Sequence, residues 1–360
     1  MRDEVIEQLA LKSDALTALA ADWRKLLFPD ASDERFADGY AQAVTFGLLM
    51  ARAKNIPLNQ GLDQVAQQLG KSSSLIGAAL RLLTDNADNQ KTLKTSLDTL
   101  TRVLDVVDWT KISKGKPEAW LYFYEDFLEI YDHALRKLTG SYYTPPEAVA
   151  SMVRLVDEAL KSPSFGLHAG LASPTVMVAD PATGTGTFLL GVLRRIAQTV
   201  EADEGKGAVK GKINEAVGRL IAFEMQLGPF AVAQLRILAE IVELTGAPPK
   251  LDARMFVTDT LSNPDDDQSW IPGVLANIAK SRRDANKTKR DEPITAVIGN
   301  PPYKKSQRPW RLGGGRRRQK PERCAARRMD AAARMEGQRA QQTPEKSLRL
   351  FLALGDVESV

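Results

Sequence analysis

The tetrapeptide Asn300-Pro301-Pro302-Tyr303 has the residue types needed to hold a planar amine for chemical attack on a methyl group. The nitrogen of such an amine is a weak nucleophile because its lone pair is delocalised. An Asn side-chain carbonyl and a neighbouring backbone carbonyl can accept both N–H groups and direct the lone pair towards a methyl donor. Proline fixes φ and donates no hydrogen bond, so the loop would be stiff, and Tyr303 could stack on the planar group. Positioning would supply most of the rate effect without a strong general base.

The same four residues are also compatible with an ordinary turn. The apolar run Ile294–Gly299 comes directly before them and predicts a buried strand. A short motif after a strand matches by chance often enough that it decides little alone. The chemical interpretation therefore depends on whether a donor site lies earlier in the chain.

A strand, a glycine-containing loop and a helix follow one another between residues 176 and 196. Val176–Ala179 predicts a short buried strand, Asp180–Phe188 is the loop, and apolar residues recur at helical spacing in Leu189–Ile196. This is the first unit of a doubly wound sheet, in which ligands bind beyond the carboxyl ends of the strands. The loop lacks the third glycine of the dinucleotide fingerprint and the lysine of a P-loop. Asp180 suits a cationic or hydroxyl-rich ligand better than a pyrophosphate.

Two further predicted strands end near acidic residues. Leu220–Phe223 is followed by Glu224, and Met255–Val257 is followed within two residues by Asp259. Glu224 could accept hydrogen bonds from ribose hydroxyls, and Asp259 could accept one from an adenine amino group. Taken singly, each is more simply a solvated loop acid. Three acids at successive strand ends, with Asn300 at the fourth, favour a single composite site.

These segments resemble the motifs of S-adenosylmethionine-dependent methyltransferases. Asp180–Phe188 is similar to their donor-binding motif, and Asn300–Tyr303 to the catalytic motif of amino methyltransferases. Gly140–Pro146 resembles the segment that precedes the donor motif in adenine-specific (N6) DNA methyltransferases of restriction–modification systems. The motif order is that of their gamma class, and the resemblance extends from about Trp120 to Lys304.

The resemblance implies methylation of adenine in double-stranded DNA, with S-adenosylmethionine as cofactor and extrusion of the target base from the duplex. Restriction or specificity subunits would be further partners. The cofactor-binding residues implied are Tyr143, Thr144, Pro145, Asp180, Ala182, Gly184, Gly186, Thr187, Phe188, Glu224 and Asp259. The catalytic residues implied are Asn300, Pro301, Pro302 and Tyr303.

The expected fold class is α/β, a Rossmann-like methyltransferase sheet preceded by an α-helical domain. Residues 1–138 form the helical domain, with amphipathic helices expected near 14–28, 36–49, 74–83 and 93–104. Residues 139–304 form a partial catalytic domain, and residues 305–360 a basic tail that is expected to be disordered. The carboxyl-terminal strands of the methyltransferase sheet are not recognisable, so we expect about four strands and an exposed edge after Ile298.

The formal net charge of +4 conceals an uneven distribution. Lys304–Val360 contains 15 Lys and Arg against 6 acids, so residues 1–303 are net acidic. One interpretation is an arginine-rich arm that contacts nucleic-acid phosphates. We favour the hypothesis of a frameshift, because an amino-acid sequence rich in Arg, Ala and Gly is typical of a GC-rich gene translated out of frame. A frameshift just after Lys304 would remove half of the pocket for the target base. This chain would then be truncated, and its methyltransferase activity would be impaired.

The composition argues against several other classes. The single cysteine, Cys324, cannot form a disulfide framework within the chain, and His133 and His168 lack metal-ligand spacing, so no metal site is expected. No signal-peptide or membrane-spanning run is recognisable, and we expect a cytoplasmic protein.

Two alternative functions remain open. The Asn-Pro-Pro-Tyr motif is also found in protein-glutamine methyltransferases and some RNA-guanine methyltransferases, although Tyr142–Pro145 and the helical extension favour DNA. The other alternative is a non-enzymatic DNA-binding or docking remnant that uses the helical domain and the basic tail. Such a remnant would bind DNA in a salt-sensitive way without binding the donor.

Overall fold

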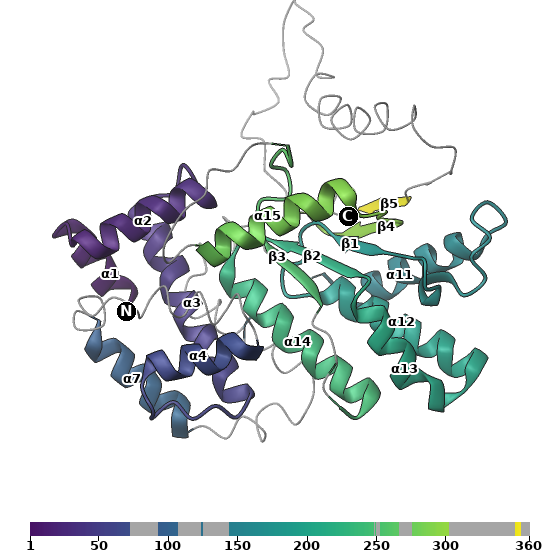
Figure 1. Cartoon of the computed structure of the whole chain (residues 1–360), viewed down its shortest axis with the longest axis horizontal. Coiled ribbons are helices and arrows are strands. Elements are labelled where there is room, and N and C mark those ends of the chain that lie inside the picture. Colours follow the sequence, from purple (N-terminus) through teal and green to yellow (C-terminus); the bar gives the residue numbers. More distant parts are fainter. Residues whose placement is uncertain are drawn as a thin grey trace, which may run out of the picture. The chain divides into compact units, whose positions relative to one another are not determined.

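The fold was analysed in a computed structural model of the chain (Figure 1). The structure describes residues 1–72, 93–106, 124, 144–247, 249, 253–265, 276–301 and 350–353. The chain divides into two units, and the second of them, Tyr303–Leu348, lies outside the described residues.

Five parallel strands form one sheet in the order β3-β2-β1-β4-β5. They are β1 (Val178–Asp180), β2 (Leu220–Glu224), β3 (Arg254–Val257), β4 (Ala296–Gly299) and β5 (Leu350–Ala353). The strands predicted at 176–179, 220–223, 255–257 and 294–299 are confirmed to within two residues at each end. Short apolar runs identified them because strands of a parallel sheet are buried on both faces.

The fifth strand corrects one expectation. We expected an exposed edge after β4, but β5 pairs with β4 from Ala296 opposite Leu350 to Gly299 opposite Ala353. Four residues of the tail are thus part of the sheet. The expectation was wrong because it gave the Arg, Ala and Gly content of the tail more weight than the local apolar run Leu350–Leu354.

Helices cover both faces of the sheet. After the amino-terminal region they are α11 (Pro146–Lys161), the 3₁₀ turn η1 (Gly170–Ala172), α12 (Thr187–Glu204), α13 (Lys206–Val217), α14 (Leu227–Thr245) and α15 (Ala276–Asp291). Val178 and Ala222 point into a large core shared with α11 to α14. Ala179 and Ile221 point to the opposite face and pack with Ala285 of α15. In Figure 1, α14 and α15 accordingly lie on opposite sides of the strands.

The charged, glycine-containing stretch Glu201–Lys212 between the first two strands is helical on both sides of one residue. Helix α12 continues to Glu204, and α13 begins at Lys206. Gly205 separates the two helices with φ +84°, which is a conformation that glycine adopts at little cost.

The described part of the amino-terminal region is helical. Its helices are α1 (Arg2–Ala10), α2 (Asp14–Leu26), α3 (Asp33–Ala53), α4 (Leu62–Ser72) and α7 (Lys94–Val106). The helices predicted near 14–28, 36–49 and 93–104 are confirmed, and the one near 74–83 lies outside the described residues. Ser32 caps α3, because its hydroxyl accepts a hydrogen bond from the backbone N–H of Arg35.

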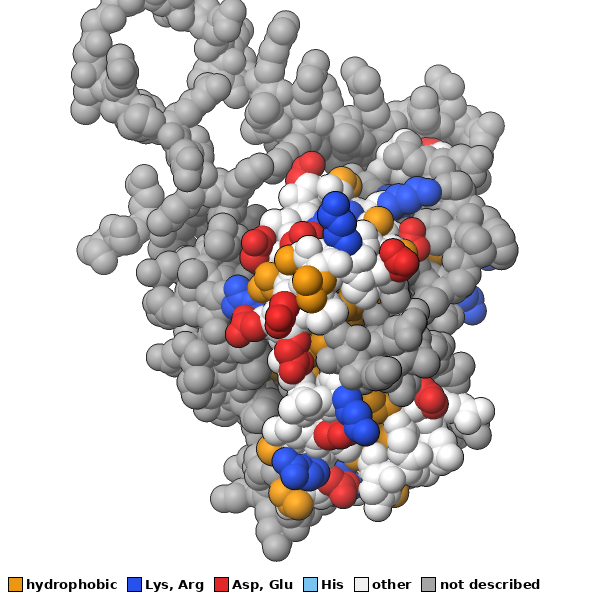
Figure 2. All heavy atoms as spheres, turned by 90° about the vertical axis from the view of Figure 1, so that its left-hand side faces the viewer, with side chains coloured by type: hydrophobic (Ala, Val, Ile, Leu, Met, Phe, Trp, Pro, Cys, Tyr) orange, Lys and Arg blue, Asp and Glu red, His pale blue; other side chains and the backbone are white. Residues whose placement is uncertain are grey.

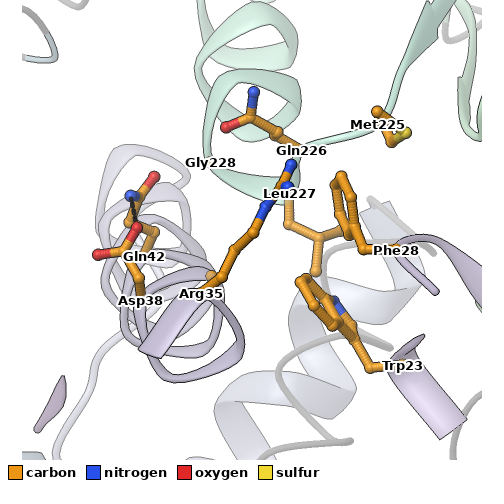
Figure 3. Close-up of a pocket in the computed structure, with 10 residues that line it drawn as sticks. Trp23, Phe28, Arg35, Asp38, Gln42, Met225, Gln226, Leu227 and Gly228 are labelled. Atoms are coloured by element: carbon orange, nitrogen blue, oxygen red, sulfur yellow. Dashed lines mark hydrogen bonds between the residues drawn. The ribbon is translucent and has the colours of Figure 1, made fainter. Parts of the chain in front are cut away.

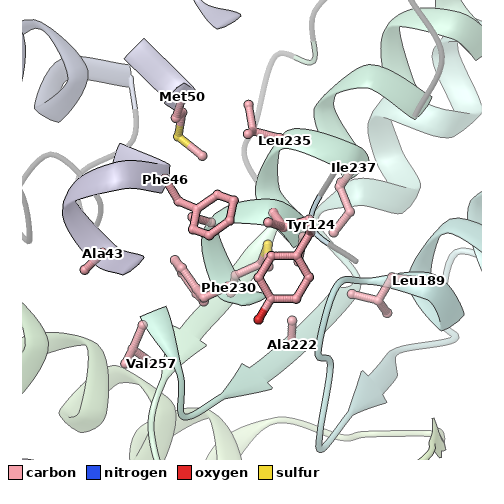
Figure 4. Packing of buried hydrophobic residues seen from close by; sticks show 14 of the residues in the cluster. Ala43, Phe46, Met50, Tyr124, Leu189, Ala222, Phe230, Leu235, Ile237 and Val257 are labelled. Atoms are coloured by element: carbon pink, nitrogen blue, oxygen red, sulfur yellow. The ribbon is translucent and has the colours of Figure 1, made fainter. Parts of the chain in front are cut away.

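The helical region and the sheet share one continuous core. Phe46 of α3 meets Tyr124 edge-to-face, with ring centroids 5.3 Å apart, and Phe230 of α14 lies beside them (Figure 4). All three side chains are buried. Tyr124 belongs to a cluster of aromatic residues between positions 120 and 131, and the rest of that cluster lies outside the described residues. The helices therefore form part of the support of the sheet.

The described surface carries mixed charge. On the side where α1 and α2 lie in Figure 1, acidic and basic side chains are interspersed (Figure 2). Within the ranges that the structure describes, no helix is both long enough and apolar enough to span a bilayer.

Candidate active site

The residues expected at the strand ends lie at one edge of the sheet. Asp180 is the last residue of β1, Glu224 is the last residue of β2, and Asp259 follows β3 by two residues. Asn300 directly follows β4. Because all the strands are parallel, their carboxyl ends meet at the same edge. Tyr143, Pro302 and Tyr303 lie outside the described residues.

The loop after β1 depends on two left-handed glycines. Gly184 has φ +53° and Gly186 has φ +86°, and Gly186 is the N-cap of α12. A side chain at either position would strain the backbone. A Cβ atom at Gly186 would in addition lie 3.3 Å from the Cβ of Ala233 in α14. The expected donor loop is therefore tightly shaped by the fold itself.

Backbone hydrogen bonds hold this loop against the end of β2. The N–H of Thr183 donates to the carbonyl of Phe223 over 3.0 Å, and the N–H of Gly186 donates to the carbonyl of Thr183 over 2.8 Å. The backbone N–H of Gly184 donates to Oε2 of Glu224 over 2.9 Å. The loop and the tip of β2 thus form one hydrogen-bonded unit.

Glu224 accepts more hydrogen bonds from the backbone than we expected from the sequence. Its Oε1 accepts hydrogen bonds from the backbone N–H groups of Met225 and Gln226, each at 2.8 Å, in addition to the bond that Oε2 accepts from Gly184. A carboxylate has about four acceptor positions, so little capacity remains for ribose hydroxyls. Burial raises the pKa of Glu224, and the three backbone donors oppose that rise.

Asp180 is fully buried and only half satisfied. Its Oδ1 accepts a hydrogen bond of 3.1 Å from the N–H of Ala182, whereas Oδ2 has no partner among the described residues. Burial raises the pKa of Asp180 to about 7, with a smaller contribution from the charge of Glu224. A Cβ atom at Gly299 would lie 2.6 Å from Oδ1, so β4 can approach Asp180 only because residue 299 is glycine.

Asn300 is joined to a segment that lies 156 residues earlier in the chain. Its Nδ2 donates to the hydroxyl of Thr144 over 3.2 Å. Its Oδ1 is buried and has no partner among the described residues. A buried carbonyl without a donor costs free energy, so this atom is suited to receive an N–H group from a ligand. Pro145 and Pro301, which flank this pair, are exposed.

The loop after β3 is held by a lysine that we did not identify from the sequence. Oδ1 of Asp259 accepts a hydrogen bond from the N–H of Leu261 over 2.9 Å, and its backbone carbonyl accepts one from Nζ of Lys289 over 3.0 Å. Nζ of Lys289 also lies 5.7 Å from the ring centroid of Phe223. Burial lowers the pKa of Lys289 to about 8.

Arg236 of α14 is a second residue that the sequence analysis missed. It is buried, and its NH1 donates to the carbonyl and hydroxyl of Thr185, at 2.7 and 3.1 Å, and to the hydroxyl of Thr187 at 3.1 Å. A single arginine within the largely apolar run Phe230–Ile237, whose only other polar residue is Gln234, was the available signal. Of the expected loop residues, Thr187 contacts this arginine and Phe188 is buried in the large core.

Comparison with protein families decides the general class. The family described as N-6 DNA methylase matches residues 121–329, which is more than half of the chain. The chain belongs to the N-6 DNA methylase family. The matched residues include Thr144, the donor loop, both following acids and Asn300. At the level of the family, the resemblance inferred from the motifs is confirmed. No curated protein matches the sequence significantly.

Solved structures with the same fold include three complexes with DNA or a DNA mimic. The DrdV–DNA complex is 21% identical, with a TM-score of 0.56, and the overlap covers 84% of this chain and 27% of that chain. The ATP-dependent Type ISP restriction-modification enzyme LlaBIII bound to DNA is 20% identical, with a TM-score of 0.58, covering 84% and 20%. A nuclease-deletion mutant of the Type ISP enzyme LlaGI with a DNA substrate mimic is 21% identical, with a TM-score of 0.57, covering 85% and 24%.

The extent of these overlaps is informative. Residues 139–360 are fewer than two thirds of the chain, so an overlap of 84% must include part of the helical region. The similarity of fold is thus not confined to the sheet. The chain spans only about a quarter of the length of these structures.

Proposed function

We propose that this chain carries the site that transfers a methyl group from S-adenosylmethionine to the N6 amino group of adenine in DNA. The observation that carries the proposal is Oδ1 of Asn300, a buried acceptor without a partner among the described residues, directly after β4 of an N-6 DNA methylase. An exocyclic amino group offers two N–H donors. Oδ1 of Asn300 would accept one, and the carbonyl of Pro301 would accept the other.

The described residues fit S-adenosylmethionine at the same edge. Asp180 offers a buried oxygen without a described partner, and Gly184 leaves the loop without a side chain where the ligand would approach. Glu224 and Asp259 would serve the ribose and the adenine, each with part of its acceptor capacity. When bound, S-adenosylmethionine supplies an electrophilic methyl group on a sulfonium centre.

The protein would contribute positioning and desolvation rather than a strong base. Two hydrogen-bond acceptors on the amino group would turn its lone pair towards the methyl group. The close approach of β4 to Asp180 would fix the distance between these acceptors and the methyl donor. Tyr303, outside the described residues, remains the predicted stacking partner of the flipped base.

DNA is the proposed substrate for two reasons. The chain belongs to the N-6 DNA methylase family, and the three matched structures are described as complexes with DNA or a DNA mimic. In addition, Lys280, Arg283 and Lys287 form an exposed stripe on α15, and none of the three has a carboxylate partner in the part of the chain that the structure describes. Such a stripe complements phosphates. We place the function in restriction–modification, with restriction or specificity subunits as candidate partners.

The proposal is tested with purified chain, tritiated S-adenosylmethionine and duplex DNA of mixed sequence. Label recovered in N6-methyladenine supports it, and label transferred to a protein or RNA panel instead would reassign the substrate. Salt-sensitive DNA binding without binding of S-adenosylhomocysteine in calorimetry would favour the non-enzymatic alternative. The frameshift after Lys304 remains a prediction; sequencing the gene across that codon tests it, and robust DNA labelling would contradict the expected impairment.

A further inference from the structure

A small pocket lies where the helical region meets the segment that follows Glu224 (Figure 3). Its volume is about 40 Å³. Phe28, Arg35, Asp38 and Gln42 line it from the helical region, and Met225–Gly228 lines it from the start of α14. The guanidinium of Arg35 lies 4.5 Å from the ring centroid of Phe28. The space admits water rather than an organic ligand, so the pocket is of interest for the segment that it borders.

That segment is also hydrogen-bonded to Glu224, a residue of the expected donor site. The backbone N–H groups of Met225 and Gln226 donate to Oε1 of Glu224, and Oε2 of the same carboxylate accepts from Gly184 in the donor loop. A displacement of residues 225–228 would therefore move the carboxylate of Glu224 and, through it, the loop after β1. Through the side chain of Glu224, the segment connects the helical region to the expected donor site.

Gln42 and Gly228 are packed closely across this junction. A Cβ atom at Gly228 would lie 2.6 Å from Oε1 of Gln42. Gln42 cannot easily move aside, because it is buried and its Nε2 donates to Oδ2 of the buried Asp38 over 3.0 Å. Burial raises the pKa of Tyr124, and the charges of Glu224 and Asp38 add to that rise.

We propose that α3 of the helical region, through Gln42 held by Asp38, positions the Met225–Gly228 segment and so sets the affinity of the donor site. The inference rests on the proposed function, because it presumes donor binding at this edge of the sheet. Gln42 and Asp38 act here as positioning residues and do not touch the donor. The helical region thereby acquires a role in cofactor binding that is separate from any contact with DNA.

The test is the affinity for S-adenosylhomocysteine, measured by calorimetry on the full chain. We expect Gly228→Ala to weaken binding by about tenfold or more, because the new Cβ atom must displace Gln42 or the segment. In Gly228→Ala/Gln42→Ala the obstructing amide is absent. We therefore expect the affinity of this double variant for S-adenosylhomocysteine to come close to that of Gln42→Ala alone. Gly211→Ala is the matched control, since a Cβ atom there would meet nothing within 4 Å.

The double variant also separates two causes of a loss of donor affinity in Gly228→Ala. Gly228 precedes Pro229, and a Cβ atom before proline strains helical backbone by itself. Strain of that kind would persist in Gly228→Ala/Gln42→Ala, and persistence of the full loss would overturn the role of Gln42. A lower melting temperature of Gly228→Ala with unchanged affinity would show a purely structural contact and would also overturn the inference. Failure of the unaltered chain to bind S-adenosylhomocysteine would instead overturn the proposed function.

Discussion

Asp180 is a residue at which burial and ionisation conflict. Its side chain is inaccessible to solvent, and burial raises its pKa to about 7 from an ordinary value of 3.8. The native protein therefore binds more protons at this carboxyl group than the unfolded chain does between these two pH values. The resulting contribution to stability is present at low pH and is lost as the pH rises through the folded pKa.

We expect the free energy of unfolding of the unaltered chain to fall by a few kcal/mol between pH 4 and pH 7.5, at about 1.4 kcal/mol per pKa unit. The reference is Asp180→Asn, whose side chain at this position does not titrate. Urea titrations of both proteins at several pH values provide the measurement. Parallel pH profiles for the two proteins would contradict this expectation.

Asn300 is expected to act on the target base and not on the donor. Replacing it by Ala removes the buried Oδ1 acceptor, and we expect methyl transfer to fall by about 10²-fold or more, as for other preorganised hydrogen bonds at reacting groups. The affinity for S-adenosylhomocysteine should stay within about threefold, because donor and base use different residues. Tritium transfer and calorimetry measure the two quantities. A parallel loss of donor affinity would place Asn300 in the donor site instead.

The strand-end acids were predictable as single residues, but their contacts were not. Asp180, Glu224 and Asp259 each terminate an apolar run, so a local pattern locates them. The bond between Asn300 and Thr144 spans 156 residues, and the contact between Gly299 and Asp180 depends on the pairing of β4 with β1. Only the assembled sheet brings such residues together.

At the scale of single elements, α15 carries a stripe of exposed cations. Lys280, Arg283 and Lys287 recur along one side of the helix, whose Ser281 hydroxyl accepts a hydrogen bond from the backbone N–H of Val257 at the end of β3. This contact places the start of the stripe near the active-site edge. Under the proposed function, helix α15 would guide the phosphate backbone of DNA past the site.

We expect Lys280→Gln/Lys287→Gln to lower the slope of log Kd against log salt by about 2, since each phosphate contact contributes about 0.9. Fluorescence anisotropy with a labelled duplex at several salt concentrations measures the slope. Lys206→Gln/Lys210→Gln removes two exposed lysines from α13 and is the matched control. An equal change of slope in both variants would show that only total charge matters.

Element prediction succeeded where one signal dominated and failed where signals competed. The helices near 14–28 and 93–104 follow from uninterrupted apolar periodicity. Strand β5 was missed because its apolar run is short and lies in a segment dominated by arginine. Helix α13 was missed because three glycines near its start suggested a loop, although the interior positions are compatible with a helix.

At the scale of the whole first unit, the shared core predicts cooperative behaviour. Phe46 and Phe230 are both fully buried where α3 meets α14. We expect a single calorimetric unfolding transition for the helices and the sheet together, and we expect Phe46→Ala to lower its midpoint through a loss of about 3–5 kcal/mol. Limited proteolysis should not release a stable fragment of residues 139–304. Two separate transitions would show that the helical region folds on its own.

The sequence separated the helical region from the sheet because composition and periodicity change near residue 138. Whether two such regions share a core is decided by side-chain packing between α3 and α14, which leaves no signature in either segment alone. The boundary near residue 138 lies outside the described residues and stays a prediction, whereas the described helices before it pack on α14.

The order of the strands has a consequence for how the protein is made. The strands β3, β2 and β1 are neighbours in the sheet and are encoded between residues 178 and 257, whereas β4 must return to pair Val178 with Ala296. A nascent chain can therefore assemble the edge that carries Asp180, Glu224 and Asp259 while the Asn300 loop is still within the ribosome. The Asn300 loop is added later, by a contact of high sequence separation that forms slowly. During synthesis, the proposed donor site would thus form before the proposed site for the target base.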